Sequence, residues 1–358
     1  MPFSPHHASR STDDARVIDE PTIIDLPVRG SVPTALSGQY VCISEGMIDA
    51  VSLAEGGAPS YGHRSFPTDA TNVIAFGSSI LAFGDAVLAY EIGAGLDTVR
   101  RVDLAGASRS LTARSKVDPN TGELHVLTFT RDPSQLHVRV SPGGLTRAVR
   151  SIDDAPSRIW QLELTRDCVV LLAEGFLGLT DRNGLGARTS WFPVDTEARY
   201  IAAAHDDGEI VVVYGTGPSL VRWTLDRRST TAQSQVLDAT PQTFASSNRR
   251  PVGDAHRFLW TVGSDAVHKH DLLAGTRQSH DFGSGRHPSD HAFVADPDRS
   301  GTEDGGWLVG FVHDDARHEA DFVVLDAQAI ERPAVAIVPI PRRIPNGAYG
   351  TWIPKVQI

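Results

Sequence analysis

Histidine and acidic side chains are the residues of this chain whose spacing suggests chemistry. The sequence has fourteen histidines, and His287, Asp290 and His291 fall close together, with His313 and His318 further along. Imidazole and carboxylate groups are common metal ligands. The segment that holds the first three reads GSGRHPSDH, a polar loop before a predicted strand, where histidines are more often solvated than ligating. Solvated histidines are the favoured interpretation of this loop, and a metal site there is the alternative.

Other side chains that often carry catalysis lack the necessary pattern. The sequence has no Gly-rich phosphate loop, no G-x-S-x-G elbow and no C-x-x-C pair. The acidic pairs at positions 153–154, 206–207 and 314–315 lie in predicted turns, which favours solvated loop tips. Cys42 and Cys168 each sit in an apolar run, so we expect two buried, reduced thiols and a cytoplasmic protein.

The elements that would position a site are strands. Short β-rich runs separated by turn residues predict an all-β chain, and long helical periodicity is absent. These runs include GQYVCIS, NVIAFGSSILAFGD, ELHVLTFT, CVVLLAEG, EIVVVYG, FLWTVGS, WLVGFVHD, DFVVLDAQ and VAIVPIP. About twenty-eight strands of this spacing would fit, enough for seven four-stranded blades, although no blade signature repeats clearly.

Charge and hydropathy exclude several kinds of partner. The net charge of −11 argues against a nucleic-acid partner, which would require clustered Lys and Arg. No apolar run approaches the length of a membrane span, and the first residues lack the apolar stretch of a signal peptide, so we expect no stable membrane insertion. Residues 1–20 are predicted to be a disordered tail, and residues 21–358 one domain.

The end of the chain carries the most specific motif. The stretch VVLDAQAIERPAVAIVPIPRRIPNGAYGTWIP is similar to the way carotenoid cleavage oxygenases end, with a strand, a PRR-x-P turn and a G-x-H-G-x-W segment. Further stretches follow in that family's order, among them GSVPTALSGQYV, LTARSKVDPNTGELHVLTF and TFASSNRRPVGDAHRFLWTVG. The resemblance covers nearly the whole chain. It implies a seven-bladed β-propeller with an apolar tunnel leading to a metal on the axis. The loops that dome over one face are expected to be reduced, because the chain is shorter than typical members.

The family's four iron-binding histidines are missing from the matching positions. Arg114 stands in the family's T-A-H-P-K segment, Trp160 in the M-H-D-F segment and Tyr349 in the terminal G-x-H-G segment, while Tyr200 is the best placement for the remaining ligand. The glutamates that orient the family's histidines align with Asp85, Thr243 and Asp290.

The replacement residues decide what the site can bind. Arginine stays protonated and the Trp indole only donates, so Arg114 and Trp160 cannot ligate iron, and tyrosine ligates only as phenolate. We therefore expect no metal and no cofactor at this position. A simple packing of the axis, with Arg114 neutralised by Asp85 or Asp290, is one interpretation. A functional site is the other, because polar and charged side chains fill a void at a higher desolvation cost than Leu or Phe.

The leading hypothesis is an iron-independent enzyme that cyclises or isomerises a hydrophobic polyene or polyketide-type molecule without oxygen. Arg114 would hold an acidic or enolate head group, and Tyr349 and Tyr200 would donate hydrogen bonds to a carbonyl. Asp85 or Asp290 would act as a base. Substrate contacts are predicted for Trp160, as an aromatic wall, and for Thr243. Two alternatives remain: a binding protein without catalysis, and an oxygenase with a relocated metal.

Overall fold

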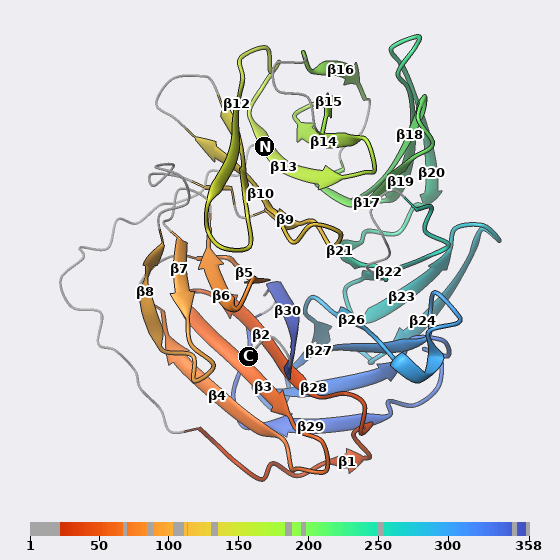
Figure 1. Cartoon of the computed structure of the whole chain (residues 1–358). Helices are drawn as coiled ribbons and strands as arrows, with labels where there is room; N and C mark the ends of the chain where they lie inside the picture. The colour runs from red at the N-terminus through yellow and green to blue at the C-terminus, as the bar shows by residue number, and fades with distance from the viewer. Residues whose placement is uncertain are drawn as a thin grey trace.

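Seven sheets arranged in a ring make up the fold. The computed structural model describes residues 22–66, 70–84, 89–102, 111–112, 114–129, 135–182, 188–194, 198–248, 254–345 and 349–355. Within these residues, thirty strands and one short 3₁₀ helix, η1 (Pro297–Arg299), are present. The expected β-propeller with seven blades is confirmed (Figure 1).

Apart from the innermost strand of blade 1, the first three blades come from the N-terminal part of the chain. Blade 1 contains, from the axis outward, β30 (Tyr349–Pro354), β2 (Gly38–Ser44), β3 (Met47–Leu53) and β4 (Ser60–Ser65). Blade 2 contains β5 (Asn72–Phe76), β6 (Ser79–Phe83), β7 (Ala89–Ile92) and β8 (Thr98–Val102). Blade 3 contains β9 (Lys116–Val117), β10 (Leu124–Phe129), β11 (Gln135–Val140) and β12 (Thr146–Ile152).

The next three blades repeat the same antiparallel order. Blade 4 contains β13 (Ile159–Leu164), β14 (Cys168–Ala173), β15 (Phe176–Asp181) and β16 (Ser190–Pro193). Blade 5 contains β17 (Tyr200–Asp206), β18 (Ile210–Thr216), β19 (Leu220–Asp226) and β20 (Thr231–Asp238). Blade 6 contains β21 (Thr243–Ser246), β22 (Phe258–Val262), β23 (Ala266–Asp271) and β24 (Thr276–Asp281).

Blade 7 and blade 1 close the ring with strands from opposite ends of the chain. Blade 7 contains β25 (Arg286–Pro288) and β26 (Ala292–Ala295), which both pair with β27 (Gly306–Asp314), then β28 (Glu319–Asp326), β29 (Ala336–Ile340) and β1 (Arg29–Gly30). The early strand β1 thus completes blade 7, and the late strand β30 pairs with β2 in blade 1. Strands from the two ends of the chain are thus built into neighbouring blades, which closes the ring of sheets.

Hydrophobic side chains fill the spaces between neighbouring blades. One cluster joins Tyr40 and Cys42 of blade 1 to Phe311 and Phe322 of blade 7, and comparable clusters lie between the other blades. Alternation along each strand sends successive side chains to the two blade interfaces, which is why the apolar runs are nearly continuous. Both cysteines are buried and unlinked, as expected.

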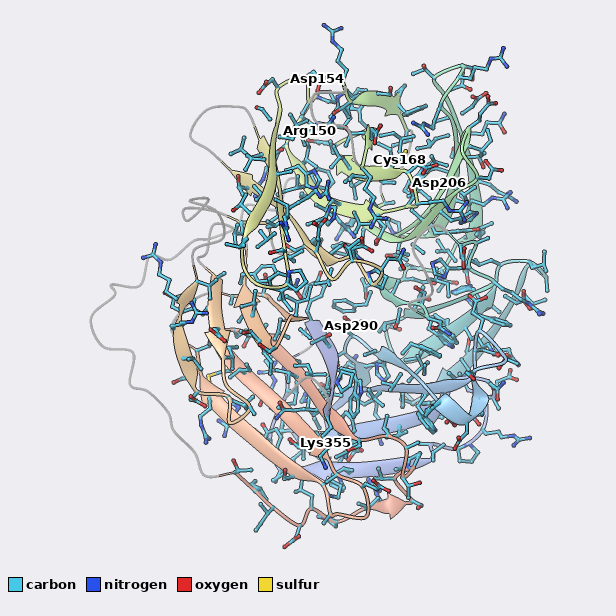
Figure 2. The ribbon with its side chains drawn as sticks, in the orientation of Figure 1. Arg150, Asp154, Cys168, Asp206, Asp290 and Lys355 are labelled. Atoms are coloured by element: carbon cyan, nitrogen blue, oxygen red, sulfur yellow. The ribbon has the colours of Figure 1, made fainter. Side chains whose placement is uncertain are left out.

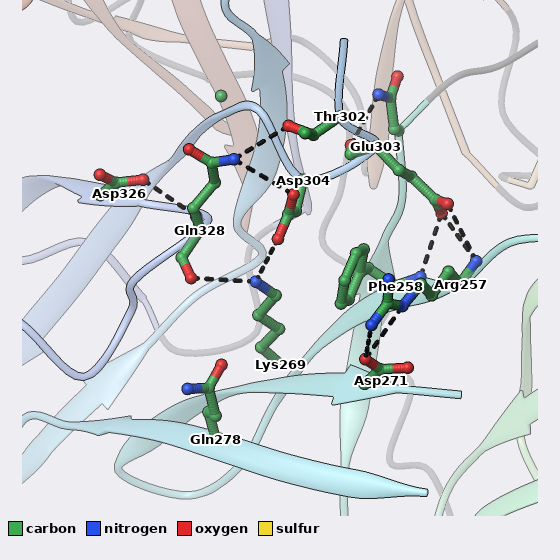
Figure 3. Close-up of polar contacts among 12 residues, drawn as sticks. Arg257, Phe258, Lys269, Asp271, Gln278, Thr302, Glu303, Asp304, Asp326 and Gln328 are labelled. Atoms are coloured by element: carbon green, nitrogen blue, oxygen red, sulfur yellow. Dashed lines mark hydrogen bonds and ion pairs between the residues drawn. The ribbon is translucent and has the colours of Figure 1, made fainter. Parts of the chain in front are cut away.

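Polar ties also cross between blades. The buried ammonium group of Lys269 on β23 lies 2.7 Å from Asp304 and 3.1 Å from the carbonyl of Gln328, both in blade 7 (Figure 3). The same ammonium lies 4.5 Å from the ring centroid of Phe258. A buried lysine requires such partners, because an unpaired charge in the interior is strongly unfavourable. No helix among the described residues is long and apolar enough to cross a membrane.

Candidate functional site

The site lies where the inner strands of several blades begin. Arg114 lies two residues before β9, Tyr200 is the first residue of β17, and Tyr349 is the first residue of β30. A parallel bridge between Arg114 and Gln161 links the inner strands of blades 3 and 4. Inner strands of neighbouring blades contact one another around the axis (Figure 1). Residues at the starts of these strands therefore lie near one another although they are far apart in the sequence.

A cation flanked by two phenol rings is the centre of the site. The guanidinium carbon of Arg114 lies 3.9 Å from the ring centroid of Tyr200 and 4.6 Å from that of Tyr349. Both distances fall within the range of an attractive cation–π contact. All three side chains keep part of their surface exposed. The structure therefore brings together three of the residues selected from the sequence.

Asp290 supplies an acidic group beside this cation. It lies between β25 and β26, close to β30 near the centre of the ring (Figure 2). Although Asp290 retains some exposed surface, protein surrounds it, and this burial raises the pKa of its carboxyl to about 7. The backbone N–H of Gly350, the charges of Arg114 and Lys116, and the N–H of His291 act in the opposite direction. Asp290 thus titrates in the pH range where it could take up or release a proton.

An ion pair that the sequence analysis did not select lies next along the same strands. Lys116 of β9 lies 2.6 Å from the carboxylate of Glu163 on β13, and the exposed fractions of the two side chains are 37% and 13%. Residues two apart on a strand share a face, so Lys116 follows Arg114 on the same side. The i, i+2 spacing of Arg114 and Lys116 was a signal that could have identified Lys116.

Strand irregularities set which side chains reach this end of the axis. The pairing of β13, β17 and β21 with their neighbours each shifts by one residue, at Trp160, Ala202 and Phe244 respectively. Such a bulge re-aims the side chains on either side of it. Phe244 has a φ of 39°, and its ring meets that of Tyr349 edge-on at 4.8 Å.

The contacts of Trp160 and Thr243 are with backbone carbonyl groups. Trp160 is half-buried and its indole N–H donates to the carbonyl of Arg199 at 3.3 Å. Thr243 is exposed, and its hydroxyl lies 3.5 Å from the carbonyl of Val262. Asp85 lies outside the described residues. Phe244, rather than Thr243, therefore contacts the described centre of the site.

The resemblance to iron enzymes raises the question whether these residues fit a metal ion. A guanidinium group has no lone pair to donate and stays positively charged, so it repels a divalent cation. Here that group occupies the space between Tyr200 and Tyr349. The indole nitrogen of Trp160 is a donor only and is directed at a carbonyl. Arg114 and Trp160 therefore do not fit as iron ligands.

The histidines weighed above as a possible metal site have other partners in the structure. His287 pairs with Asp315 at 2.9 Å, and His313 lies 3.4 Å from the same carboxylate. His291 is buried, with its Nδ1 2.8 Å from the carbonyl of Ser289. Across the described part of the chain, no three His, Cys, Asp or Glu side chains gather as a group that could hold a metal ion.

Comparisons with known proteins agree with the architecture. The sequence profile of the family described as Retinal pigment epithelial membrane protein matches residues 187–354. The "Carotenoid cleavage oxygenase" of Mycobacterium tuberculosis is 24% identical over 486 aligned positions, which cover 95% of this chain and 96% of that protein. The alignment is longer than the chain's 358 residues, so the relative carries insertions that are missing here.

Solved structures show the same fold. The lignostilbene dioxygenase of Pseudomonas brassicacearum superposes with a TM-score of 0.84 at 18% identity, covering 96% of this chain and 97% of that one. The cobalt-substituted oxygenase of Synechocystis gives a TM-score of 0.82 at 18% identity, with the same coverage.

Proposed function

This chain belongs to the carotenoid cleavage oxygenase family, and from that premise we propose that it is an iron-independent enzyme acting on a conjugated hydrophobic molecule at the propeller axis. The observation that carries the proposal is the guanidinium of Arg114 between Tyr200 and Tyr349, at positions where the resemblance places histidine ligands. The proposed reaction is an isomerisation or cyclisation that leaves the mass of the substrate unchanged. No cofactor and no oxygen are required.

The charges of the site support a substrate with an acidic or enolic head group. Arg114 and Lys116 bring two cations to the axis, whereas Glu163 is paired with Lys116 and Asp290 is protonated below about pH 7. A carboxylate or enolate oxygen is the natural partner of a guanidinium group. Relatives named for carotenoid and lignostilbene act on conjugated molecules, which favours a polyene or similarly conjugated body for the substrate.

The roles of the side chains follow from a balanced proton transfer. Asp290, in its ionised form, takes a proton from a saturated carbon attached to the conjugated system, and the C–H electron pair moves through that system to form an extended enolate on the carbonyl oxygen. Arg114 and the hydroxyls of Tyr349 and Tyr200 stabilise the negative oxygen. Asp290 then returns the proton to a different carbon, so no electrons are gained or lost overall. We also propose that Trp160 and Thr243 contact the substrate and that Asp85 is an additional base. The proposed location of the protein is the cytoplasm.

The experiment combines metal analysis with turnover. Purified protein is assayed with polyene acids, such as retinoic acid, with and without oxygen, and products are separated by mass spectrometry. Tyr349→Phe keeps the ring that contacts Arg114 and Phe244 but removes the hydroxyl, so turnover should fall about 100-fold, the scale for loss of one oxyanion donor. Tyr214→Phe, on the strand behind Tyr200, is the matched control and should retain turnover.

Three outcomes separate the candidate functions. Isomers of unchanged mass, formed without iron and without oxygen, would support the proposal. Oxygen-dependent cleavage products that track stoichiometric iron would overturn it in favour of a relocated metal site. Tight binding of the polyene acid without any conversion, in wild type and Tyr349→Phe alike, would overturn catalysis in favour of a carrier.

A further inference from the structure

A buried tyrosine joins the closing blade to the acidic residue of the site. Tyr40 on β2 is fully buried, and its hydroxyl donates to the backbone carbonyl of Asp290 at 2.5 Å. Its ring packs against Phe311 and Phe322 of blade 7, with centroid separations of 5.4 Å and 5.7 Å. The packing and the hydrogen bond together hold the Tyr40 hydroxyl against the Asp290 carbonyl.

A glycine on the neighbouring strand makes room for that hydroxyl. The side chain of any other residue at position 350 would overlap the hydroxyl and ring of Tyr40. Gly350 directly follows Tyr349 in β30, and its own N–H donates to the carboxylate of Asp290. Tyr40 and Gly350 therefore hold the two ends of one residue: Tyr40 binds the backbone carbonyl and Gly350 binds the side chain.

We infer that Tyr40 is a positioning residue that, through the space left by Gly350, fixes the Asp290 carboxyl beside Tyr349 and Arg114. The functional consequence rests on the function proposed above, but the contact itself does not. Tyr40 touches no reacting group. It acts by preventing the segment between β25 and β26 from sliding away from β30, which would carry the Asp290 carboxyl off the Gly350 N–H.

Several other groups also influence Asp290 and must be kept constant in a test. Arg114, Lys116, Tyr40 and Cys42 come from neighbouring elements, and His291 is the next residue in the chain. Of the contacts that favour its charged form, the Gly350 N–H is the largest. Loss of this contact should therefore make the carboxyl a weaker acid.

The experiment follows Asp290 without any substrate, so its result is independent of whether turnover is found. Infrared difference spectra across neutral pH report the band of a protonated carboxyl, and Asp290→Asn identifies the band. Wild type should titrate near pH 7, as burial of the carboxyl implies. In Tyr40→Phe the midpoint should rise by about one pH unit, the size expected when a backbone hydrogen bond to a carboxylate is lost.

Matched variants separate positioning from general damage. Tyr61→Phe removes another buried hydroxyl of the same core cluster, one that bonds to Asp49, and should leave the Asp290 midpoint unchanged. Gly350→Ala should raise the midpoint as Tyr40→Phe does, whereas Gly143→Ala, where a methyl group meets open space, should not. Faster amide exchange at Gly350 in Tyr40→Phe than in Tyr61→Phe is expected as a second sign.

Two results would overturn the inference. One is a folded Tyr40→Phe protein whose Asp290 midpoint and Gly350 exchange match those of wild type. The other is the absence, near neutral pH, of any carboxyl band that disappears in Asp290→Asn, because Asp290 would then not be enclosed as the arrangement requires. Neither result depends on the polyene assay, so a failure of the proposed function is recognised separately.

Discussion

The contact between Arg114 and Tyr200 can be measured without knowing the substrate. We consider the variants Arg114→Met and Tyr200→Leu, alone and together. Methionine keeps much of the length of arginine but has no charge, and leucine removes the π face. If the guanidinium lies over the ring as described, the two substitutions should not be additive, because each removes the same interaction.

The expected magnitude follows from the distance and the burial. At 3.9 Å from the ring centroid, with both side chains partly buried, the contact should contribute about 1 kcal/mol, between the values for exposed and desolvated pairs. Equilibrium unfolding in urea, followed by tryptophan fluorescence, gives the free energy of unfolding for each protein in the cycle. The same cycle with Tyr349→Leu should give a smaller coupling, because that centroid is 4.6 Å away.

Tyr214 provides a control for the coupling between Arg114 and Tyr200. Tyr214 lies on β18 and faces His205, with a centroid separation of 6.1 Å, so Arg114→Met and Tyr214→Leu should be additive. A coupling below about 0.3 kcal/mol between Arg114 and Tyr200 would show that the cation is not held there. The assignment of the axial site would then fail, because it depends on the Arg114 guanidinium lying between the two phenol rings.

Three further predictions concern acidity and charge. Burial lowers the pKa of His125 to about 3 and that of His137 to about 4, so the unfolded chain binds more protons below pH 6.5. The free energy of unfolding should be highest above that pH and should fall on acidification, by about 2 kcal/mol per histidine at pH 5. Urea unfolding at a series of pH values measures this fall, which should be smaller in His137→Gln. Asp304→Asn leaves the buried Lys269 ammonium without its carboxylate and should cost about 3 kcal/mol of unfolding free energy, more than Lys269→Met, as thermal unfolding would reveal. Turnover, where Asp290 acts as the base, should rise as pH increases through about 7, and a rate that falls over this range would exclude that role.

Much of the fold was predictable because each strand is a short, nearly continuous apolar run between turns. The run GQYVCIS corresponds to β2, and the runs around Leu124–Phe129 and Cys168–Ala173 correspond to β10 and β14. The number of blades came from the resemblance, since no blade motif repeats. The closure by β1 and β30 joins residues about three hundred positions apart, and local spacing contains no signal for such pairing.

The site was predictable in part. Aligned motifs selected Arg114, Tyr200 and Tyr349, which the structure brings together. The sequence analysis selected Thr243 and missed Phe244, because a bulge at Phe244 shifts the alternation of side chains along β21 by one position. A bulge is set by packing against the neighbouring blade, and a one-residue slip exchanges the faces of a strand. Period-two reasoning therefore fails where inner strands begin, which is where the site lies.

An arginine where the resemblance places a ligand histidine would change what the axis can do without removing its positive charge. A guanidinium between two phenols can attract and orient an oxyanion, as a metal ion can, but it cannot change oxidation state or exchange ligands. In the proposed reaction, proton transfer comes from a carboxyl whose pKa lies near 7, and burial places the pKa of Asp290 at about that value. Since the function of such a carboxyl depends on where it is held, the hydroxyl of Tyr40 and the space at Gly350 matter as much as the residues that face the substrate.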